Sequence, residues 1–386
     1  MNDTPSASAR VMAPAPIPFI DLQAQRRRIA DRIDRAIARV LEHGMFIMGP
    51  EVAQLERQMA EFVGVRHAVS CGSGTEALLM PLMVRGIGGG DAVFVPSFTF
   101  AATAEVVALV GATPVFVDVL PETFNMDPAS LEAAIKEAGS GGLRPAAVIP
   151  VDLFGLAADY EALNTLARRH DLLVIEDAAQ SYGGTFRGRR ACSLAEVAAT
   201  SFFPSKPLAC YGDGGAIFTD DADFAARLRS IRVHGQGTDK YDNVVVGLNG
   251  RLDTLQAAIL LEKHTLLEDE LVRRQQVAAR YSAALRGLVE VPRVPEGYES
   301  AWAQYTILVD QRDRVAAALK ASGIPTAIYY PKPLHLQQAY AACPQPASGL
   351  AVSTRFATRV LSLPMHPYLD EPTQDRIVET LTAAVR

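Results

Sequence analysis

The chain has 386 residues, of which 49% are hydrophobic and 21% are charged, a balance typical of a soluble enzyme with a large domain and a smaller one. Its formal net charge of −6 argues against nucleic acid or an anionic membrane surface as a partner, since neither attracts an acidic protein. No apolar run is long enough to span a bilayer, and the four cysteines lack metal-ligand spacing. We therefore expect a cytoplasmic protein with reduced thiols and no metal site.

The N-terminal residues predict a flexible tail followed by two helices. Residues 1–14 are rich in Ser, Ala and Pro and lack the charged and apolar regions of a signal peptide. Apolar residues then recur at helical spacing over residues 29–41 and 51–63, and Gly44 and Gly64 end these helices.

Short apolar strands then alternate with helical segments. Strands are predicted at 67–70, 92–95, 114–117, 146–150 and 172–176, and helices at 75–84, 101–110, 131–136 and 158–169. Strands that are apolar throughout indicate a mostly parallel sheet with helices on both faces. The fold class is therefore α/β.

The pattern changes after Gly250. A long helix-forming stretch over 251–285 is followed by predicted strands at 303–309 and 326–330 and helices at 314–321 and 374–384. We expect three parts, namely the tail (1–14), a large ligand-binding domain (15–250) and a smaller α+β domain (251–386).

Two segments of the large domain suit an anion. The run Gly72-Ser73-Gly74-Thr75 lies between a predicted strand and a predicted helix, where free N–H groups and the positive end of the helix favour phosphate. Ser201 offers a hydroxyl at the end of another predicted strand. Taken alone, a Gly-Ser-Gly segment with a capping threonine is more often only a turn.

A carboxylate and an amine follow two later strand ends. Asp177 ends the apolar run 172–176, and Lys206 lies shortly after Ser201. Ligands in open α/β sheets bind at the carboxyl ends of the strands, so we expect these groups to lie near Gln180 and Phe98. Pyridoxal 5′-phosphate (PLP) requires an amine that forms an imine and an acid that holds the pyridinium proton. By itself, Asp177 could be a helix cap and Lys206 a surface lysine.

These segments make the sequence similar to a known family. It resembles the DegT/DnrJ/EryC1/StrS family of PLP-dependent sugar aminotransferases over nearly the whole chain. The segments that carry the resemblance are 19–22, 49–50, 72–78, 96–99, 176–181 (EDAAQS), 201–208 (SFFPSKPL), 212–215, 234–235 and 249–257. The resemblance implies a fold of the aspartate aminotransferase type (PLP fold type I) and a homodimer with active sites at the subunit interface.

The resemblance also implies roles for individual residues. Lys206 is the Schiff-base lysine and Asp177 pairs with the pyridine nitrogen. Family members without the lysine catalyse dehydration, so its retention favours amino transfer. The further cofactor contacts that the resemblance implies are Gln180 at the ring hydroxyl, Phe98 over the ring, Gly74, Thr75 and Ser201 at the phosphate, and Asn249 from the neighbouring subunit.

Within the family, the chain resembles enzymes that aminate the 3-keto group of UDP-2-acetamido-2-deoxy-3-oxo-glucuronate for bacterial surface polysaccharides such as the lipopolysaccharide O-antigen. L-Glutamate is the implied amino donor. A uronate needs a cation, and Arg251 is the matching candidate, although it could instead pack at the dimer interface. The substrate-binding residues expected beside it are Tyr329 and Tyr330, where Tyr329 occupies a position at which we expect a histidine.

Two alternatives stay open. Because Tyr329 is a neutral hydroxyl, the substrate could be a 3- or 4-keto-6-deoxy nucleotide sugar. A PLP-binding regulator of the same fold without turnover is the alternative of a different class, and it is disfavoured because lysine, acid and phosphate-binding residues are retained together.

Overall fold

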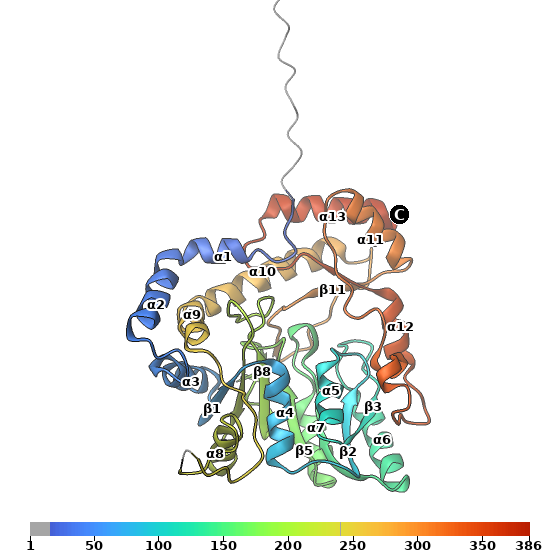
Figure 1. Cartoon of the computed structure of the whole chain (residues 1–386). Helices are drawn as coiled ribbons and strands as arrows, with labels where there is room; N and C mark the ends of the chain where they lie inside the picture. Colours follow the sequence, from blue (N-terminus) through green and yellow to red (C-terminus); the bar gives the residue numbers. More distant parts are fainter. Residues whose placement is uncertain (1–15, 240) are drawn as a thin grey trace, which may run out of the picture.

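The computed structural model describes residues 16–239 and 241–386. The predicted tail at residues 1–14 lies outside these ranges. In Figure 1 a seven-stranded sheet with its helices forms the lower body, and the C-terminal part of the chain lies above it.

The central sheet has the strand order β1-β9-β8-β5-β4-β2-β3. Strand β9 is antiparallel to its neighbours β1 and β8, and the other neighbouring pairs are parallel. The predicted mostly parallel α/β sheet is thereby confirmed. The strands are β1 (His67–Cys71), β2 (Asp91–Pro96), β3 (Thr113–Val117), β4 (Arg144–Val148), β5 (Leu173–Asp177), β8 (Val197–Ser201) and β9 (Gly215–Thr219).

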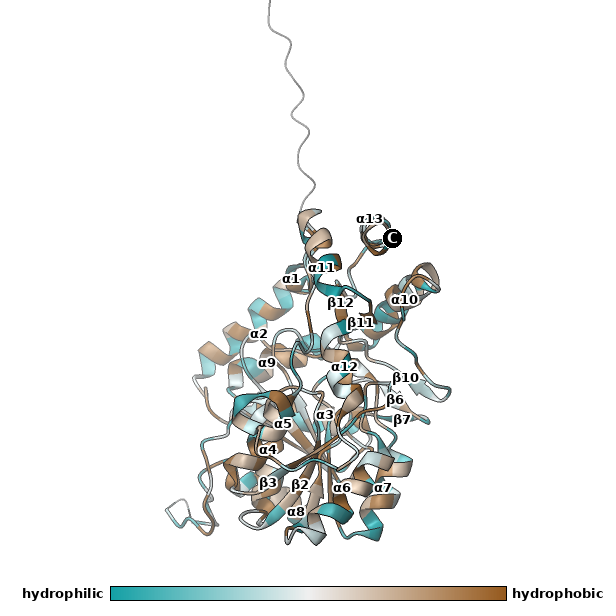
Figure 2. Cartoon of the chain, turned by 90° about the vertical axis from the view of Figure 1, so that its right-hand side faces the viewer, coloured by the Kyte–Doolittle hydropathy of each residue, from teal (hydrophilic) through white to brown (hydrophobic). Residues whose placement is uncertain are grey.

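Helices cover both faces of this sheet. Along β2, Val93 packs in one core and Phe94 in another, because successive side chains of a strand point to opposite faces. The first face carries α4 (Gly74–Val84), α5 (Ala102–Leu109) and α8 (Ala222–Ile231). The second carries α6 (Pro128–Ser140), α7 (Tyr160–Arg169) and, nearer β1, α3 (Pro50–Val63). Figure 2 shows the apolar sheet enclosed between these layers.

The C-terminal part has its own apolar core. It is built around the two-stranded sheet of β11 (Tyr305–Leu308) and β12 (Val360–Leu363). The helices there are α10 (Leu267–Leu285), α11 (Arg312–Ala321), α12 (Ala351–Arg359) and α13 (Glu371–Val385). The remaining elements are α1 (Leu22–Arg28), α2 (Ala30–His43), η1 (Leu153–Gly155), β6 (Thr185–Phe186), β7 (Arg189–Arg190), α9 (Thr254–His264), β10 (Tyr298–Glu299), η2 (Leu334–Leu336) and η3 (Gln338–Tyr340).

Two expected elements differ from the structure. The predicted helix over 251–285 is two helices, α9 and α10, because α9 packs against α2 and α3 whereas the end of α10 enters the C-terminal core. One straight helix could not both pack against α2 and α3 and enter the C-terminal core. The predicted strand at 326–330 forms only a bridge from Ala327 to Ser362, after which the chain turns so that Tyr329 and Tyr330 join an aromatic cluster.

Where the two domains divide stays a proposal. Leu260 and Leu267 belong to the core of the sheet domain, although they lie beyond residue 250, and Tyr281 belongs to the C-terminal core. The packing supports a division inside α10.

Asp118, which follows β3, caps helix α12 across the two parts of the chain. Its carboxylate accepts hydrogen bonds from the backbone N–H groups of Val352 and Ser353 at 3.0 and 2.8 Å and from the Ser353 hydroxyl at 2.6 Å. The N-cap residue of α12 itself, Leu350, provides no side-chain cap. The start of α12 therefore depends on a residue of the large domain.

We predict that Asp118→Ala lowers the free energy of unfolding by about 2 kcal/mol, because it leaves several buried donors without an acceptor. Asp127→Ala is the control, since it removes a single cap bond at α6 and should cost about 1 kcal/mol. Denaturant unfolding of both variants measures the difference. An equal loss in the two variants would contradict a special role for Asp118.

Candidate active site

The first turn of α4 forms a cradle for an anion at the end of β1. Ser73 caps the helix by accepting a hydrogen bond from the Glu76 N–H at 3.1 Å. Gly74 lies against Ser201, since a Cβ at Gly74 would come within 2.6 Å of the Ser201 Cβ. The start of α4 at Gly74 and Thr75 therefore lies next to Ser201 at the end of β8, and their contact with a phosphate stays a prediction. Backbone N–H groups and the helix dipole suit a phosphate there.

Asp177 ends β5 on the sheet face that carries α5. Its Oδ2 accepts a hydrogen bond from the Thr103 hydroxyl at 3.0 Å, and its Oδ1 accepts one from the Ala179 N–H at 3.2 Å. Burial raises the pKa of Asp177, whereas the Ala179 N–H, the charge of Lys206 and the Thr103 hydroxyl lower it. These three groups therefore favour the ionised carboxylate that a protonated pyridine requires.

Lys206 lies on the turn that follows β8. Its N–H donates to the Phe203 carbonyl at 2.9 Å, which orients the residue. Burial lowers the pKa of the Lys206 amine, and the negative charge of Asp177 raises it. The amine and the carboxylate thus act on each other electrostatically, so the structure brings together the pair that the sequence predicted.

Gln180, three residues after Asp177, contacts the aromatic cluster. Its amide oxygen accepts a hydrogen bond from the Phe154 N–H at 2.7 Å, and its amide nitrogen donates to the Tyr330 hydroxyl at 3.4 Å. Phe98 is buried beside Tyr330, with ring centroids 6.1 Å apart. The contact of Phe98 with a cofactor ring stays a prediction.

Arg251 and Asn249 lie on the segment that precedes α9. The Arg251 carbonyl lies beside Gly72, close to the anion cradle, and the Arg251 Nε is buried without a hydrogen-bond partner. Asn249 is exposed on the surface of the chain. A guanidinium with an unpaired buried nitrogen is suited to an anionic group that enters from outside.

Tyr329 and Tyr330 extend the candidate site to the N-terminal segment. Tyr329 is half-buried, with its ring centroid 5.9 Å from that of Tyr330 and 6.4 Å from that of Phe19. Burial raises the pKa of both tyrosines, so both hydroxyls keep their protons at neutral pH and can donate hydrogen bonds.

Two residues at this site were missed from the sequence. Thr103 contacts the Asp177 carboxylate directly, and Thr99 lies 3.3 Å from the Thr103 hydroxyl. Thr103 lies in the first turn of α5, and Thr99 lies in the bend between β2 and α5, four residues earlier. No local sequence signal identifies them, because only the fold brings Thr103 to Asp177.

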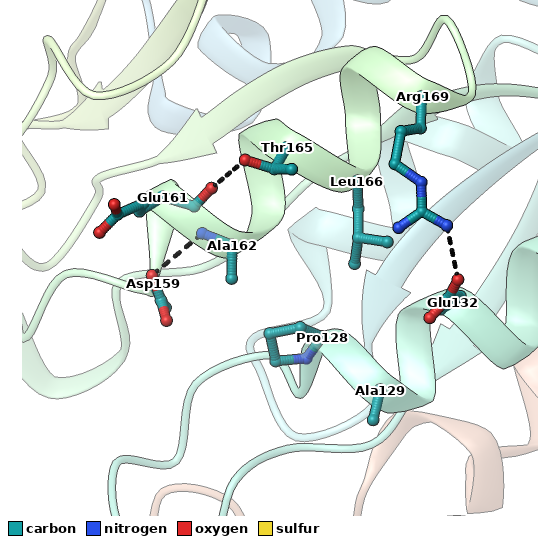
Figure 3. Close-up of a pocket in the computed structure, with 9 residues that line it drawn as sticks. All are labelled: Pro128, Ala129, Glu132, Asp159, Glu161, Ala162, Thr165, Leu166 and Arg169. Carbon is teal, nitrogen blue, oxygen red and sulfur yellow. Dashed lines mark hydrogen bonds and ion pairs between the residues drawn. The ribbon is translucent and has the colours of Figure 1, made fainter.

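Other features of the described residues lie apart from this site. The groove in Figure 3 runs between α6 and α7, where Arg169 pairs with Glu132 at 2.8 Å. In the described part of the chain there is no cluster of side chains suited to a metal ion. No helix in residues 16–239 or 241–386 is long and apolar enough to cross a membrane.

The comparisons with known proteins agree with this geometry. Residues 27–382 match the model of the DegT/DnrJ/EryC1/StrS aminotransferase family. A Pseudomonas aeruginosa protein, UDP-2-acetamido-2-deoxy-3-oxo-D-glucuronate aminotransferase, is 50% identical over 367 residues, which cover 95% of this chain and 99% of the relative.

Solved structures are similar over almost the whole chain. A DegT DnrJ EryC1 StrS aminotransferase from Brucella abortus has 55% identity and a TM-score of 0.95, and the match covers 96% of this chain and 99% of that one. The ntda protein of Bacillus subtilis, solved with bound cofactor PMP, has 30% identity and a TM-score of 0.87, with 96% and 85% covered. These similarities confirm the fold expected from the sequence.

We predict that Thr103→Val weakens PLP binding about 10-fold, because the Asp177 carboxylate then loses a hydrogen bond in a buried site. Thr103→Ser keeps the hydroxyl and should bind PLP within about 2-fold of the wild-type protein. Titration of the cofactor-free protein, followed by PLP absorbance, gives both dissociation constants. Equal affinities for the Val variant and the wild-type protein would show that Thr103 does not support Asp177.

Proposed function

The chain belongs to the DegT/DnrJ/EryC1/StrS aminotransferase family, and we propose that it transfers an amino group from L-glutamate to a keto group of a nucleotide-linked sugar. It is a PLP-dependent enzyme. The observation that carries the proposal is the meeting of the Asp177 carboxylate, the Lys206 amine and the α4 anion cradle at one edge of the sheet. This donor set fits PLP, because it offers an anion site, a carboxylate and an amine.

When bound, PLP supplies an electron sink for the carbon that loses a proton. Asp177 would provide the negative charge that keeps the pyridine nitrogen protonated, and Thr103 would orient the carboxylate through its hydrogen bond. The lowered pKa of Lys206 makes its neutral form more accessible, so its Nζ can accept a proton and return it. Gly74, Thr75 and Ser201 would bind the phosphate, and Gln180 would contact the ring hydroxyl.

We propose that a second copy of the chain completes this site in a homodimer. Apolar residues are exposed on the segment before α3 and on both sides of Lys206, among them Phe46, Ile47, Phe203 and Tyr211. Such a surface is suited to a second copy of the chain. The expected phosphate contact from Asn249 of the partner subunit would then lie at the interface.

For the substrate, we infer a nucleotide-linked uronate with a 3-keto group, UDP-2-acetamido-2-deoxy-3-oxo-glucuronate. The P. aeruginosa relative is named for this sugar. The unpaired Nε of Arg251 supports the inference, because a guanidinium binds a carboxylate with two parallel hydrogen bonds. Tyr329 and Tyr330 would donate further bonds. The product would enter a bacterial surface polysaccharide.

A second candidate substrate is a 3- or 4-keto-6-deoxy nucleotide sugar. The neutral Tyr329 favours it, because a neutral hydroxyl binds a carboxylate less strongly than a charged histidine does. For either sugar we place the reaction in the cytoplasm, which the free cysteines of the described chain support.

We predict that L-glutamate bleaches the absorbance of the PLP-loaded protein and releases 2-oxoglutarate before any sugar is added. Lys206 accounts for this, since it can move the proton that the donor carbon loses. Lys206→Ala should lose the response by a factor of about 1,000 or more. If no amino acid changes the spectrum of the wild-type protein, the chain is a cofactor-binding protein without turnover.

We predict that Arg251→Ala lowers kcat/KM for the 3-keto uronate 10- to 100-fold, which corresponds to about 1.5–3 kcal/mol for a lost charge-assisted hydrogen bond. For a 6-deoxy keto sugar the same variant should stay within about 3-fold, because that sugar has no carboxylate. Arg251→Lys is the matched control, which keeps the charge without the paired geometry. Equal losses on both sugars would contradict carboxylate recognition.

We predict that Phe46→Asp shifts the protein toward a monomer and weakens PLP binding in the same preparation, since the partner subunit completes the phosphate site. Leu109→Asp changes an exposed apolar residue on α5 and serves as the control. Analytical ultracentrifugation and cofactor titration give the two readouts. A Phe46→Asp monomer that binds PLP as the wild-type protein does would contradict a shared site.

A further inference from the structure

The segment after Tyr330 joins the C-terminal part of the chain to the edge of the large sheet. Leu334 is buried in the apolar core that includes α4, α5 and α8, and its N–H donates to the Ser97 carbonyl at 2.9 Å. Ser97 follows β2 directly and precedes Phe98. The segment of residues 331–335 is therefore attached to the strand end that carries Phe98.

His335 adds a second, polar attachment at the same place. Its Nδ1 lies 2.6 Å from the Ser97 Oγ, and its backbone N–H donates to that oxygen at 3.4 Å. Ser97 is 0% exposed, so water does not compete for its hydroxyl. On the other side of the ring, the Nε2 of His335 lies 3.5 Å from the Thr354 hydroxyl of α12. The imidazole thus lies between the end of β2 and α12.

The hydrogen bonds indicate which ring nitrogen of His335 carries a proton. The Ser97 oxygen accepts from the His335 N–H, so its own hydrogen is left to donate to Nδ1. The proton of a neutral ring then lies on Nε2 and faces the Thr354 oxygen, whose hydrogen is donated to the Leu350 carbonyl at 2.9 Å. Burial lowers the pKa of His335 and outweighs the opposite effect of the Asp118 charge, which agrees with a neutral ring.

The chain between Tyr330 and His335 is short and stiff. It contains Pro331 and Pro333, and a proline ring fixes φ at about −65°. Pro333 has a φ of −66°. A stiff segment transmits the position of one end to the other, so the attachment of His335 limits the movement of Tyr330. The Tyr330 ring in turn lies beside Phe98, with centroids 6.1 Å apart.

We propose that His335 is a positioning residue, which holds Tyr330 in place for the sugar substrate through its hydrogen bond with Ser97. This role rests on the proposed contact of Tyr330 with the sugar. The bond between His335 and Ser97 does not rest on that contact, so it can be tested without a substrate.

Hydrogen–deuterium exchange of the full-length, cofactor-free protein tests the bond. In the peptide that covers residues 334–337, His335→Ala should speed exchange about 10-fold, because the segment opens more easily. His335→Asn should stay within about 3-fold of the wild-type rate, since its amide oxygen can still accept from Ser97. Ser97→Ala is the milder second variant and should match His335→Ala. Unchanged exchange in both alanine variants would overturn the bond.

His170→Ala is the matched control for the exchange measurement. It removes a histidine at the end of α7, which packs on the other face of the sheet. Exchange at residues 334–337 should keep the wild-type rate in this variant. Equally fast exchange in His170→Ala and His335→Ala would overturn a specific role for His335.

The two half-reactions test the positioning role. His335→Ala should lower kcat/KM for the 3-keto uronate about 10-fold, because Tyr330 is assigned to the sugar, whereas the rate at which glutamate bleaches the PLP absorbance should stay within about 2-fold. His335→Asn should restore the reaction with the sugar to within about 3-fold of the wild-type value. Equal losses in both half-reactions would show a general structural effect and would overturn the positioning role.

Tyr330→Phe separates this role from the proposed function. The variant should also lose about 10-fold with the sugar, because it lacks the hydroxyl that His335 holds in place. If it instead reacts as the wild-type protein does, the contact assigned to Tyr330 fails and the positioning role fails with it. If glutamate does not bleach the wild-type protein, the proposed function fails, while hydrogen exchange still decides the bond between His335 and Ser97.

Discussion

The structure depends on the placement of one buried carboxylate at the end of a parallel strand. Asp177 is 5% exposed, and burial alone would favour its neutral form. The Thr103 hydroxyl, the Ala179 N–H and the positive charge of Lys206 lower the pKa and so favour the ionised form. Each of these groups lies at the same edge of the sheet, since β2, β5 and β8 run parallel. The parallel sheet is therefore what makes the active site possible.

The acidic side chains on the two faces of β5 have different surroundings. Asp177 faces the side of α5 and the anion cradle, whereas Glu176 faces a cluster that fixes the backbone behind it. Because side chains alternate along a strand, two adjacent acidic residues are separated by the sheet. In the proposed reaction Asp177 would supply the charge at the cofactor, whereas Glu176 binds the backbone N–H groups of Cys192 and Leu194. The C-terminal part adds Tyr329 and Tyr330 from a segment that forms a single bridge to its own sheet, from Ala327 to Ser362.

Much of this could be predicted from the sequence because the signals were local. Apolar strands of the large domain and the residues that follow them, such as Ser201 and Lys206, identified the sheet edge and the candidate site. What could not be predicted depends on tertiary packing. The break between α9 and α10 arises because the two helices enter different cores. Thr103 and Asp152 are polar residues of ordinary appearance, and only the fold brings them to Asp177.

A lowered amine pKa does not by itself identify the lysine that binds the cofactor. Burial also lowers the pKa of Lys263, to about 8, and its Nζ lies 4.9 Å from the centre of the Tyr211 ring. Lys206 differs because it faces Asp177 at the edge of the sheet. The most direct measurement is borohydride reduction of the PLP-loaded protein followed by peptide mass spectrometry. We expect the added mass on the peptide that contains Lys206. Attachment at Lys263 or at any other lysine would contradict it.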